Sequence, residues 1–141
     1  MKLALADINE EALAETKREV VAAGAEAMTL RWDLADLAAT DDNVTAIETE
    51  LGPVDVLVNN TGGPPPTAAL GQKPELWSKF FESMVLSVIA LTDRVVPGMR
   101  ERKWGRVITS TRTLPCAVVR VYLSSVAHRV VTTVRVDYLP E

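Results

Sequence analysis

The sequence has one cysteine, one histidine and no long apolar run, and each of these shortages excludes a class of protein. A single cysteine, Cys116, excludes an intramolecular disulfide and is typical of a reducing compartment. No stretch of about eighteen uncharged apolar residues occurs, which excludes a membrane-spanning helix. The amino terminus reaches an acid, Asp7, too early for a signal peptide. We therefore expect a cytoplasmic globular protein with no membrane contact.

The net charge of −4 is unevenly distributed along the chain. Residues 1–60 contain thirteen acids and four bases, whereas residues 61–141 contain six acids and eleven bases. A basic half can indicate a surface for nucleic acid or anionic lipid. The arginines here are scattered, however, and no aromatic residues are interleaved with them as in a base-stacking platform. We therefore predict that the protein does not bind nucleic acid.

Between residues 2 and 111, short apolar runs alternate with amphipathic stretches, which is the signature of parallel βαβ units. Asn9 is a good N-cap and Gly24 suits the position after a helix end, so they delimit the first helix. The run 59–66 ends in three prolines and cannot be a helix or a central strand. The predicted strands are Leu3–Ala6, Ala25–Leu30, Val54–Val58 and Arg106–Ser110, and the predicted helices are Glu10–Ala23, one from about Thr40 to Gly52, and Glu75–Arg102.

The longest predicted helix carries a continuous apolar stripe with residues three and four positions apart. Such a stripe packs in a core or against another subunit more often than it binds a ligand. Pro97 should kink the last turns of this helix, and Gly105 should end it. Trp32, Trp77 and Trp104 are expected to be packing residues. The stripe consists of Trp77, Phe81, Met84, Val88, Leu91, Val95 and Met99.

The composition changes abruptly after Thr111. Residues 112–141 contain eight valines and four arginines but neither glycine nor lysine. Ala117–Tyr122 and Val130–Val136 have the propensity of strands, but the caps and stops seen upstream are missing. We therefore divide the chain into a domain of residues 2–111 and a divergent tail of residues 112–141. A shifted reading frame is our hypothesis for the tail, and translation of the parent nucleotide sequence in the other frames tests it.

Several motifs occur in the order and spacing of one enzyme family. An acid ends the first predicted strand, Asp33 follows the second, and the long helix precedes the run 104–110, Trp-Gly-Arg-Val-Ile-Thr-Ser. The run Asn59-Asn60-Thr61-Gly62 looks like the family motif N-N-A-G with threonine in place of alanine. Residues 2–111 thus resemble the NAD(P)-dependent short-chain dehydrogenases/reductases, and most of all their 3-oxoacyl-[acyl-carrier-protein]-reductase-like subgroup. The resemblance implies a Rossmann-type, doubly wound parallel α/β sheet.

The resemblance also implies cofactor-binding residues at the strand ends. Asp7 would accept hydrogen bonds from the adenosine ribose, and its charge would favour NAD over NADP; its alternative role is helix capping. Asp33 and the backbone of Leu34 would meet the adenine, and the alternative for Asp33 is a turn acid. The run Asn60-Thr61-Gly62 would form the floor of the cleft, where glycine lets the backbone approach the ligand. The alternative for this run is a simple turn.

The sequence departs from the family at the opening strand and at the glycine-rich turn that follows it. That turn, of the type T-G-x-x-x-G-x-G, places backbone N–H groups and a helix N-terminus against the pyrophosphate. Here the sequence starts at the equivalent of the second strand, so the expected sheet is partial. Because the first strand is central in such a sheet, its absence should leave unpaired edges on both sides.

The residues that carry the chemistry in the family are also replaced. Met84 stands where the family has the helix asparagine of the proton relay, and a thioether cannot donate a hydrogen bond. Arg112 stands at the position of the catalytic serine. The Tyr-x-x-x-Lys pair, in which the tyrosine delivers the proton, is absent, since Tyr122 has Val126 four residues on. No catalytic residue is intact, and Ser110 and Tyr122 are only the nearest candidates.

We therefore expect a fragment of an NAD(P)-dependent short-chain oxidoreductase that is inactive by itself. The resemblance implies that intact relatives transfer hydride between nicotinamide and a carbonyl or secondary alcohol. Two alternatives are a non-catalytic partner that joins a homo- or hetero-oligomer through the helix Glu75–Arg102, and a cofactor-binding module without chemistry. No metal site is expected, because His128 has no neighbouring ligand and Cys116 is most simply a core residue.

Overall fold

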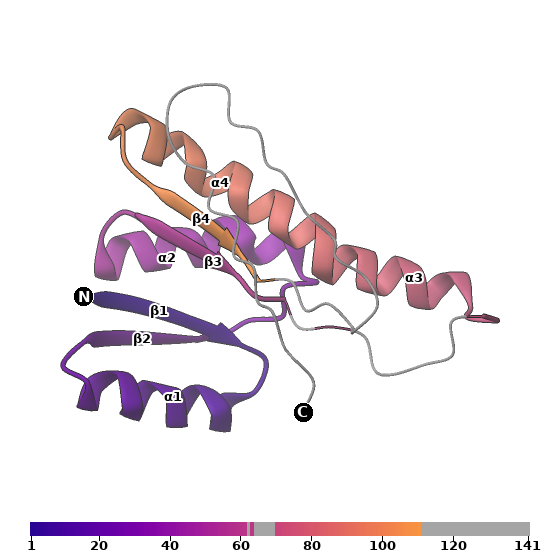
Figure 1. Cartoon of the computed structure of the whole chain (residues 1–141), viewed down its shortest axis with the longest axis horizontal. Coiled ribbons are helices and arrows are strands. Elements are labelled where there is room, and N and C mark those ends of the chain that lie inside the picture. Colours follow the sequence, from indigo (N-terminus) through magenta and orange to yellow (C-terminus); the bar gives the residue numbers. More distant parts are fainter. Residues whose placement is uncertain (62, 64–69, 111–141) are drawn as a thin grey trace, which may run out of the picture.

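The computed structural model describes residues 1–61, 63 and 70–110 of the chain. Its four strands form two parallel pairs, β1 (Lys2–Asp7) with β2 (Glu26–Arg31) and β3 (Val56–Asn59) with β4 (Arg106–Thr109). All four strands point in the same direction, and helices connect them (Figure 1). The predicted α/β class with parallel strands is confirmed. The third strand begins two residues later than predicted, at Val56 rather than Val54.

The first helix, α1 (Glu10–Ala22), has the caps that the sequence predicts. The Asn9 side-chain oxygen accepts hydrogen bonds from the backbone N–H groups of Glu11 and Ala12 at 3.0 and 3.1 Å. Gly24 follows the helix end with a φ of +84°, which glycine adopts without the steric cost of a Cβ. These two caps turn the chain from β1 back into its neighbour β2.

The second helix, α2 (Thr40–Leu51), links the two pairs of strands. A 3-10 turn, η1 (Leu37–Ala39), precedes it and was not predicted from the sequence. Helix α2 contacts β1, β2 and a later helix, α4 (Ser87–Glu101). Arg94 of α4 forms ion pairs with Glu48 and Asp41 of α2, and its hydrogen bonds to these two carboxylates raise the pKa of the guanidinium. Polar contacts thus join the outer sides of the two helices.

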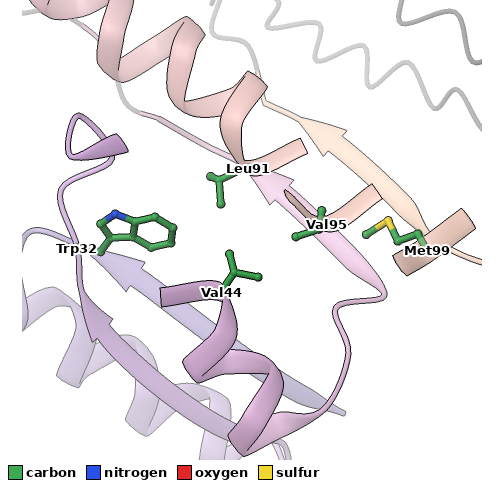
Figure 2. Packing of buried hydrophobic residues seen from close by; sticks show 5 residues of the cluster. All are labelled: Trp32, Val44, Leu91, Val95 and Met99. Atoms are coloured by element: carbon green, nitrogen blue, oxygen red, sulfur yellow. The ribbon is translucent and has the colours of Figure 1, made fainter. Parts of the chain in front are cut away.

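The buried apolar core lies between these helices and the strands (Figure 2). Trp32 directly follows β2, Val44 comes from α2, and the remaining members come from α4. Half-buried apolar residues pack against this cluster, including Leu57 of β3 and Val107 of β4. The core therefore joins the two pairs of strands through side chains. Its members are Trp32, Val44, Leu91, Val95 and Met99.

The two pairs of strands form separate sheets. Within the described part of the chain, no hydrogen-bonded ladder joins β1 to β3, although α2, which contacts β1 and β2, packs against α4, which contacts β3. Within the described residues, β1 and β3 therefore each have one edge without a paired strand. We call the place where β1 and β3 fail to pair the sheet break.

The long helix predicted from the apolar stripe consists of three consecutive helical segments. Helix α3 (Pro74–Phe81) leads into a π-helical turn, η2 (Glu82–Leu86), which continues as α4. The π turn was not predicted, because the spacing of apolar residues does not change there. The Ser87 hydroxyl donates a hydrogen bond to the carbonyl oxygen of Ser83 at 2.6 Å, which satisfies one backbone acceptor near the turn.

The helix ends at Glu101, one residue before the predicted end at Arg102. Lys103 adopts a positive φ of 56° and turns the chain toward β4. Gly105 has a different role from the predicted helix stop, since a Cβ built there would lie 2.6 Å from the Met99 side chain. Glycine is therefore required for close packing of the turn against α4.

The expectation that all three tryptophans are packing residues is wrong for two of them. Trp32 is buried in the core, but Trp77 and Trp104 are 67% and 51% exposed. Trp104 instead lies under the guanidinium of Arg106, 5.6 Å from the ring centroid. Several other positions of the sequence analysis lie outside the described residues: Gly62, Arg112, Cys116, Ala117–Tyr122, His128 and Val130–Val136.

Candidate functional site

The carboxyl ends of the four strands lie at one edge of the molecule, because all four strands run the same way (Figures 1 and 2). This edge is where open α/β sheets bind their ligands. The structure brings Asp7, Asp33, Asn60 and Ser110 to this edge, each at or just after the end of a strand. The residues that were predicted to bind the cofactor at the strand ends therefore lie at the same edge. Thr61 is half-buried beside Asn60.

Asp7 is exposed at the end of β1 and takes part in the helix start that follows. Its Oδ1 atom accepts a hydrogen bond from the backbone N–H of Asn9 at 2.8 Å. The capping role considered from the sequence is thus present. A carboxylate has about four acceptor positions, so this bond is compatible with hydrogen bonds to ribose hydroxyls.

Asp33 has a similar local role after β2. Its Oδ1 atom accepts a hydrogen bond from the backbone N–H of Ala35 at 2.9 Å, and its carbonyl oxygen accepts one from Asp36. The side chain therefore forms the turn that leads toward α2. Leu34 is half-buried and packs against the core, which fixes its backbone at the same edge.

Asn59, the last residue of β3, is the first residue of the motif found in the sequence, but no role of its own was predicted for it. It is only 3% exposed, and neither its amide nitrogen nor its amide oxygen has a hydrogen-bond partner in the described structure. Its backbone carbonyl accepts a hydrogen bond from Ser110 at 2.8 Å. A buried amide without partners costs about 1–3 kcal/mol per lost group, so this position is suited to a polar group that is not supplied by its present neighbours. The available signal was a polar residue closing an apolar strand.

The helix N-termini at this edge do not fit a diphosphate. Helix α1 begins with Glu10 and Glu11, and α2 begins with Asp41 and Asp42. A helix N-terminus binds phosphate through free N–H groups and a positive dipole end. Asn9 already caps α1, and the carboxylates in the first turns of both helices would repel a diphosphate. The N-termini of α1 and α2 therefore lack the arrangement that binds a pyrophosphate.

The described residues do not assemble a proton donor either. Ser110 is exposed and follows the last residue of β4. Met84 lies in the π turn η2 and is 36% exposed. Its thioether has no proton to donate. No group of three or more potential metal ligands occurs within residues 1–61, 63 and 70–110. None of the helices in those ranges is long and apolar enough to cross a membrane.

Comparison with known families decides the relationship. The family model for short chain dehydrogenases matches residues 1–127. The chain belongs to the short chain dehydrogenase family. The match extends beyond Thr111, so the division of the chain at that residue remains a prediction.

Known members of the family are similar over much of this chain. A short chain dehydrogenase of Pseudocercospora fijiensis (strain CIRAD86) is 38% identical over 118 residues, covering 77% of this chain and 37% of that protein. The acetoacetyl-CoA reductase of Rhizobium meliloti (strain 1021) is 33% identical over 78 residues, covering 55% and 32%. The chain thus spans about a third of the length of these relatives.

Solved structures of the family have the same fold. A 7α-hydroxysteroid dehydrogenase complexed with NADH and 7-oxo glycochenodeoxycholic acid superposes with a TM-score of 0.72 at 27% identity, over 78% of this chain and 43% of that one. L-sorbose reductase from Gluconobacter frateurii, complexed with NADPH and L-sorbose, gives 0.68 at 27% identity, over 75% and 41%. These neighbours bind nicotinamide cofactors, and their fold supports the Rossmann-type class.

Proposed function

We propose that this chain is a fragment of an NAD(P)-dependent short-chain oxidoreductase domain and that it does not transfer hydride by itself. The observation that carries this proposal is an incomplete set of cofactor-binding groups at the carboxyl ends of the strands. The carboxyl edge gathers Asp7, Asp33 and Asn60, but the sheet break lies between Asp7 and Asn60. This grouping supports the adenosine side of a nicotinamide site, and within the described residues neither a phosphate cradle nor a proton donor accompanies it.

Each part of the proposed site has a definite chemical capacity. The Asp7 carboxylate can accept hydrogen bonds from ribose hydroxyls, and its charge disfavours a 2′-phosphate, so we expect NAD to be preferred over NADP. A bound nicotinamide would supply the hydride. Reduction of a carbonyl also requires a proton, and neither Ser110 in its exposed position nor Met84 is suited to deliver one.

The direct test is an assay of the purified 141-residue chain with NADH or NADPH. Oxidation of the nicotinamide is followed by absorbance with β-ketoacyl thioesters and simple ketones as substrates. We expect no turnover above the rate in buffer. Cofactor-dependent turnover would contradict the proposal.

Calorimetric titration with NAD separates a cofactor-binding module from a fragment that does not bind. If heat of binding is measured, Asp7→Asn should reduce the affinity, because it removes the charge at the ribose. Asp55→Asn is the matched control, since Asp55 lies at the opposite, amino-terminal end of β3 and contacts Arg102. Binding without turnover would favour the cofactor-binding module over the fragment.

An exposed apolar face supports a second candidate, a non-catalytic partner in an oligomer. Helix α3 and the start of α4 expose apolar side chains on a shared surface that no described element covers. Co-expression with an intact relative, followed by size-exclusion chromatography, should then give a mixed oligomer. The double variant Trp77→Ser/Phe81→Ser should release it, and separate elution of the two unmodified chains would count against this candidate. The exposed residues are Trp77, Phe81, Met84, Val85 and Ile89.

A further inference from the structure

Two side chains of opposite charge lie next to each other at the carboxyl end of the first pair of strands. In the parallel ladder, Asp7 of β1 is the register partner of Arg31 of β2. Register partners on neighbouring strands lie about 5 Å apart and direct their side chains to the same face of the sheet. Both residues are exposed. The carboxylate at the adenosine side of the proposed site therefore has a cation as its neighbour.

Helix α1 identifies the face on which these side chains lie. The Arg31 Nε atom and a carboxylate oxygen of Glu10, the first residue of α1, are 3.3 Å apart and form an ion pair. Helix α1 packs against β1 and β2, so Arg31 and Asp7 point to the α1 side of the sheet (Figure 1). Trp32, the next residue, lies in the core with Val44 of α2. The alternation of side chains thus keeps this charged pair away from the apolar core.

The charged groups on this face have hydrogen-bonding capacity for a ligand. Asp7 accepts a hydrogen bond at Oδ1 from the backbone N–H of Asn9, and a carboxylate has about four acceptor positions. The ion pair with Glu10 is made through Nε of Arg31, and a guanidinium carries two further Nη groups with two donors each. The side chains of this ion pair are 70% and 72% exposed, so it contributes little to stability. A ligand can therefore engage Arg31 without disturbing the fold.

Arg31 is the one base within residues 1–60 that ends a strand at this edge. Of the other three bases in that range, Lys2 begins β1, and Lys17 and Arg18 lie in the later turns of α1. Acids outnumber bases here, so an anion at this edge is repelled unless Arg31 binds it. The acids at the strand ends and in the first turn of α1 are Asp7, Glu10, Glu11 and Asp33.

We propose that Arg31 is a specificity-determining residue of the adenosine site, where its guanidinium binds a 2′-phosphate and offsets the repulsion from Asp7. A guanidinium can hold a phosphate through two parallel N–H···O bonds, which are stronger than bonds between neutral groups. Asp7 alone would select an adenosine without the 2′-phosphate. With Arg31 beside it, the site takes adenosine with or without that phosphate, so the preference for NAD becomes small. This inference rests on the proposed function and names the cofactors that its site accepts.

Glu10 sets the strength of this effect. Its carboxylate and an incoming phosphate compete for the same guanidinium, because both bind arginine through negatively charged oxygens. Loss of the cation should therefore weaken phosphate binding, whereas loss of the anion should strengthen it. A purely structural role of the Arg31–Glu10 pair would give effects of the same sign for both changes.

The experiment compares two probes, adenosine and adenosine 2′-monophosphate, on the full 141-residue chain. Neither probe carries a pyrophosphate or a nicotinamide, so the result depends on neither a phosphate cradle nor hydride transfer. Titration followed by amide NMR measures both dissociation constants and locates the contact. For the unmodified chain we expect the two constants to agree within about threefold, with shifted signals at Asp7 and Arg31.

Four variants assign the effect to the guanidinium. Arg31→Met should weaken the phosphate probe about tenfold and change adenosine by less than about twofold. Arg31→Lys should recover part of this loss, because it keeps the charge but not the planar fork. Glu10→Gln should strengthen the phosphate probe about threefold. Arg18→Met is the matched control with unchanged binding, since it removes an equal charge from a side chain whose Nε donates to the Ala14 carbonyl within α1.

Three results would overturn the proposal. The first is adenosine binding together with an affinity for the phosphate probe that Arg31→Met leaves unchanged; the ribose contact at Asp7 would then stand without Arg31. The second is equal weakening of the phosphate probe by Arg31→Met and Arg18→Met, which would indicate only long-range attraction. The third is no saturable shift with either probe, which would mean that the chain has no adenosine site. The turnover assay decides the proposed function independently of these three results.

Discussion

The long helix formed by α3, η2 and α4 is buried in its carboxyl-terminal part and exposed in its amino-terminal part. In α4, Leu91, Val95 and Met99 are between 3% and 8% exposed, whereas Trp77 and Phe81 of α3 are more than half exposed. Both parts have apolar residues at the same spacing of three and four. The difference lies in what stands opposite: α2, β3 and β4 cover α4, and no described element covers the same face of α3. Apolar spacing therefore predicts a helix face but not its partner.

Truncation of a buried side chain of α4 should have the largest effect on the free energy of unfolding. Leu91→Ala removes a buried side chain that packs with Trp32 and Val44, and we expect a loss of about 2–5 kcal/mol in the free energy of unfolding. Urea denaturation followed by tryptophan fluorescence measures it. Ile89→Ala in the same helix, at a position 51% exposed, should cost about 0.5 kcal/mol or less. Equal losses at the two positions would break the comparison.

The turn after α4 should tolerate little added volume. Gly105→Ala places a methyl group 2.6 Å from the buried Met99 side chain, so Met99 or the turn must shift. We expect a loss of about 1–3 kcal/mol, as for overpacking in a core. Gly63→Ala is the control, because a Cβ there meets no atom within 4 Å. Unchanged thermal unfolding of Gly105→Ala would show that the packing at this end of α4 is loose.

Removal of the ion pairs that link α4 to α2 should have a smaller effect. Arg94→Met keeps much of the apolar stem but loses the bonds to Glu48 and Asp41. The Arg94 side chain is 29% exposed, so we expect only about 0.5–1 kcal/mol, and less at high salt. Urea denaturation at low and high salt measures the difference. A loss that is independent of salt would indicate that packing of the stem dominates.

Substitution on the exposed face of α3 should have the smallest effect on the free energy of unfolding. Trp77→Ser removes a side chain that is 67% exposed, and we expect a change within about 0.5 kcal/mol. The same variant should weaken any oligomer formed through α3. A loss above 2 kcal/mol in a chain shown to be monomeric would mean that α3 packs within its own chain.

The sequence predicted the regular elements well because their signals are local. Asn9 and Gly24 bracket α1 at the expected positions, since a cap depends on residues within one turn. The 3-10 turn η1 before α2 and the π turn η2 before α4 were not predicted, because each is about one turn long and too short to change the hydrophobic period visibly. Gly105 was predicted to be the helix stop, whereas the helix ends at Glu101 and this glycine is required for close packing against Met99.

The candidate site was predicted in part for the same reason. Acids and an asparagine pair at the ends of strands are visible in the sequence, and parallel strands bring them to one edge. The burial of the Asn59 side chain, and its lack of a partner among the described residues, was not foreseeable, because burial depends on what packs around the strand end. Gly62 and Tyr122 lie outside the described residues, so their predicted roles remain predictions.

The sequence by itself determined the order of the strands and helices, the caps of α1 and the membership of the family, because these depend on neighbours along the chain. Only the tertiary structure decided which half of the apolar stripe is buried and that the Asn59 amide has no partner among the described residues. Those properties depend on contacts between residues that are distant in sequence, such as Trp32 with the α4 side chains of the core. Burial and pairing are relations between elements, and no local pattern encodes them.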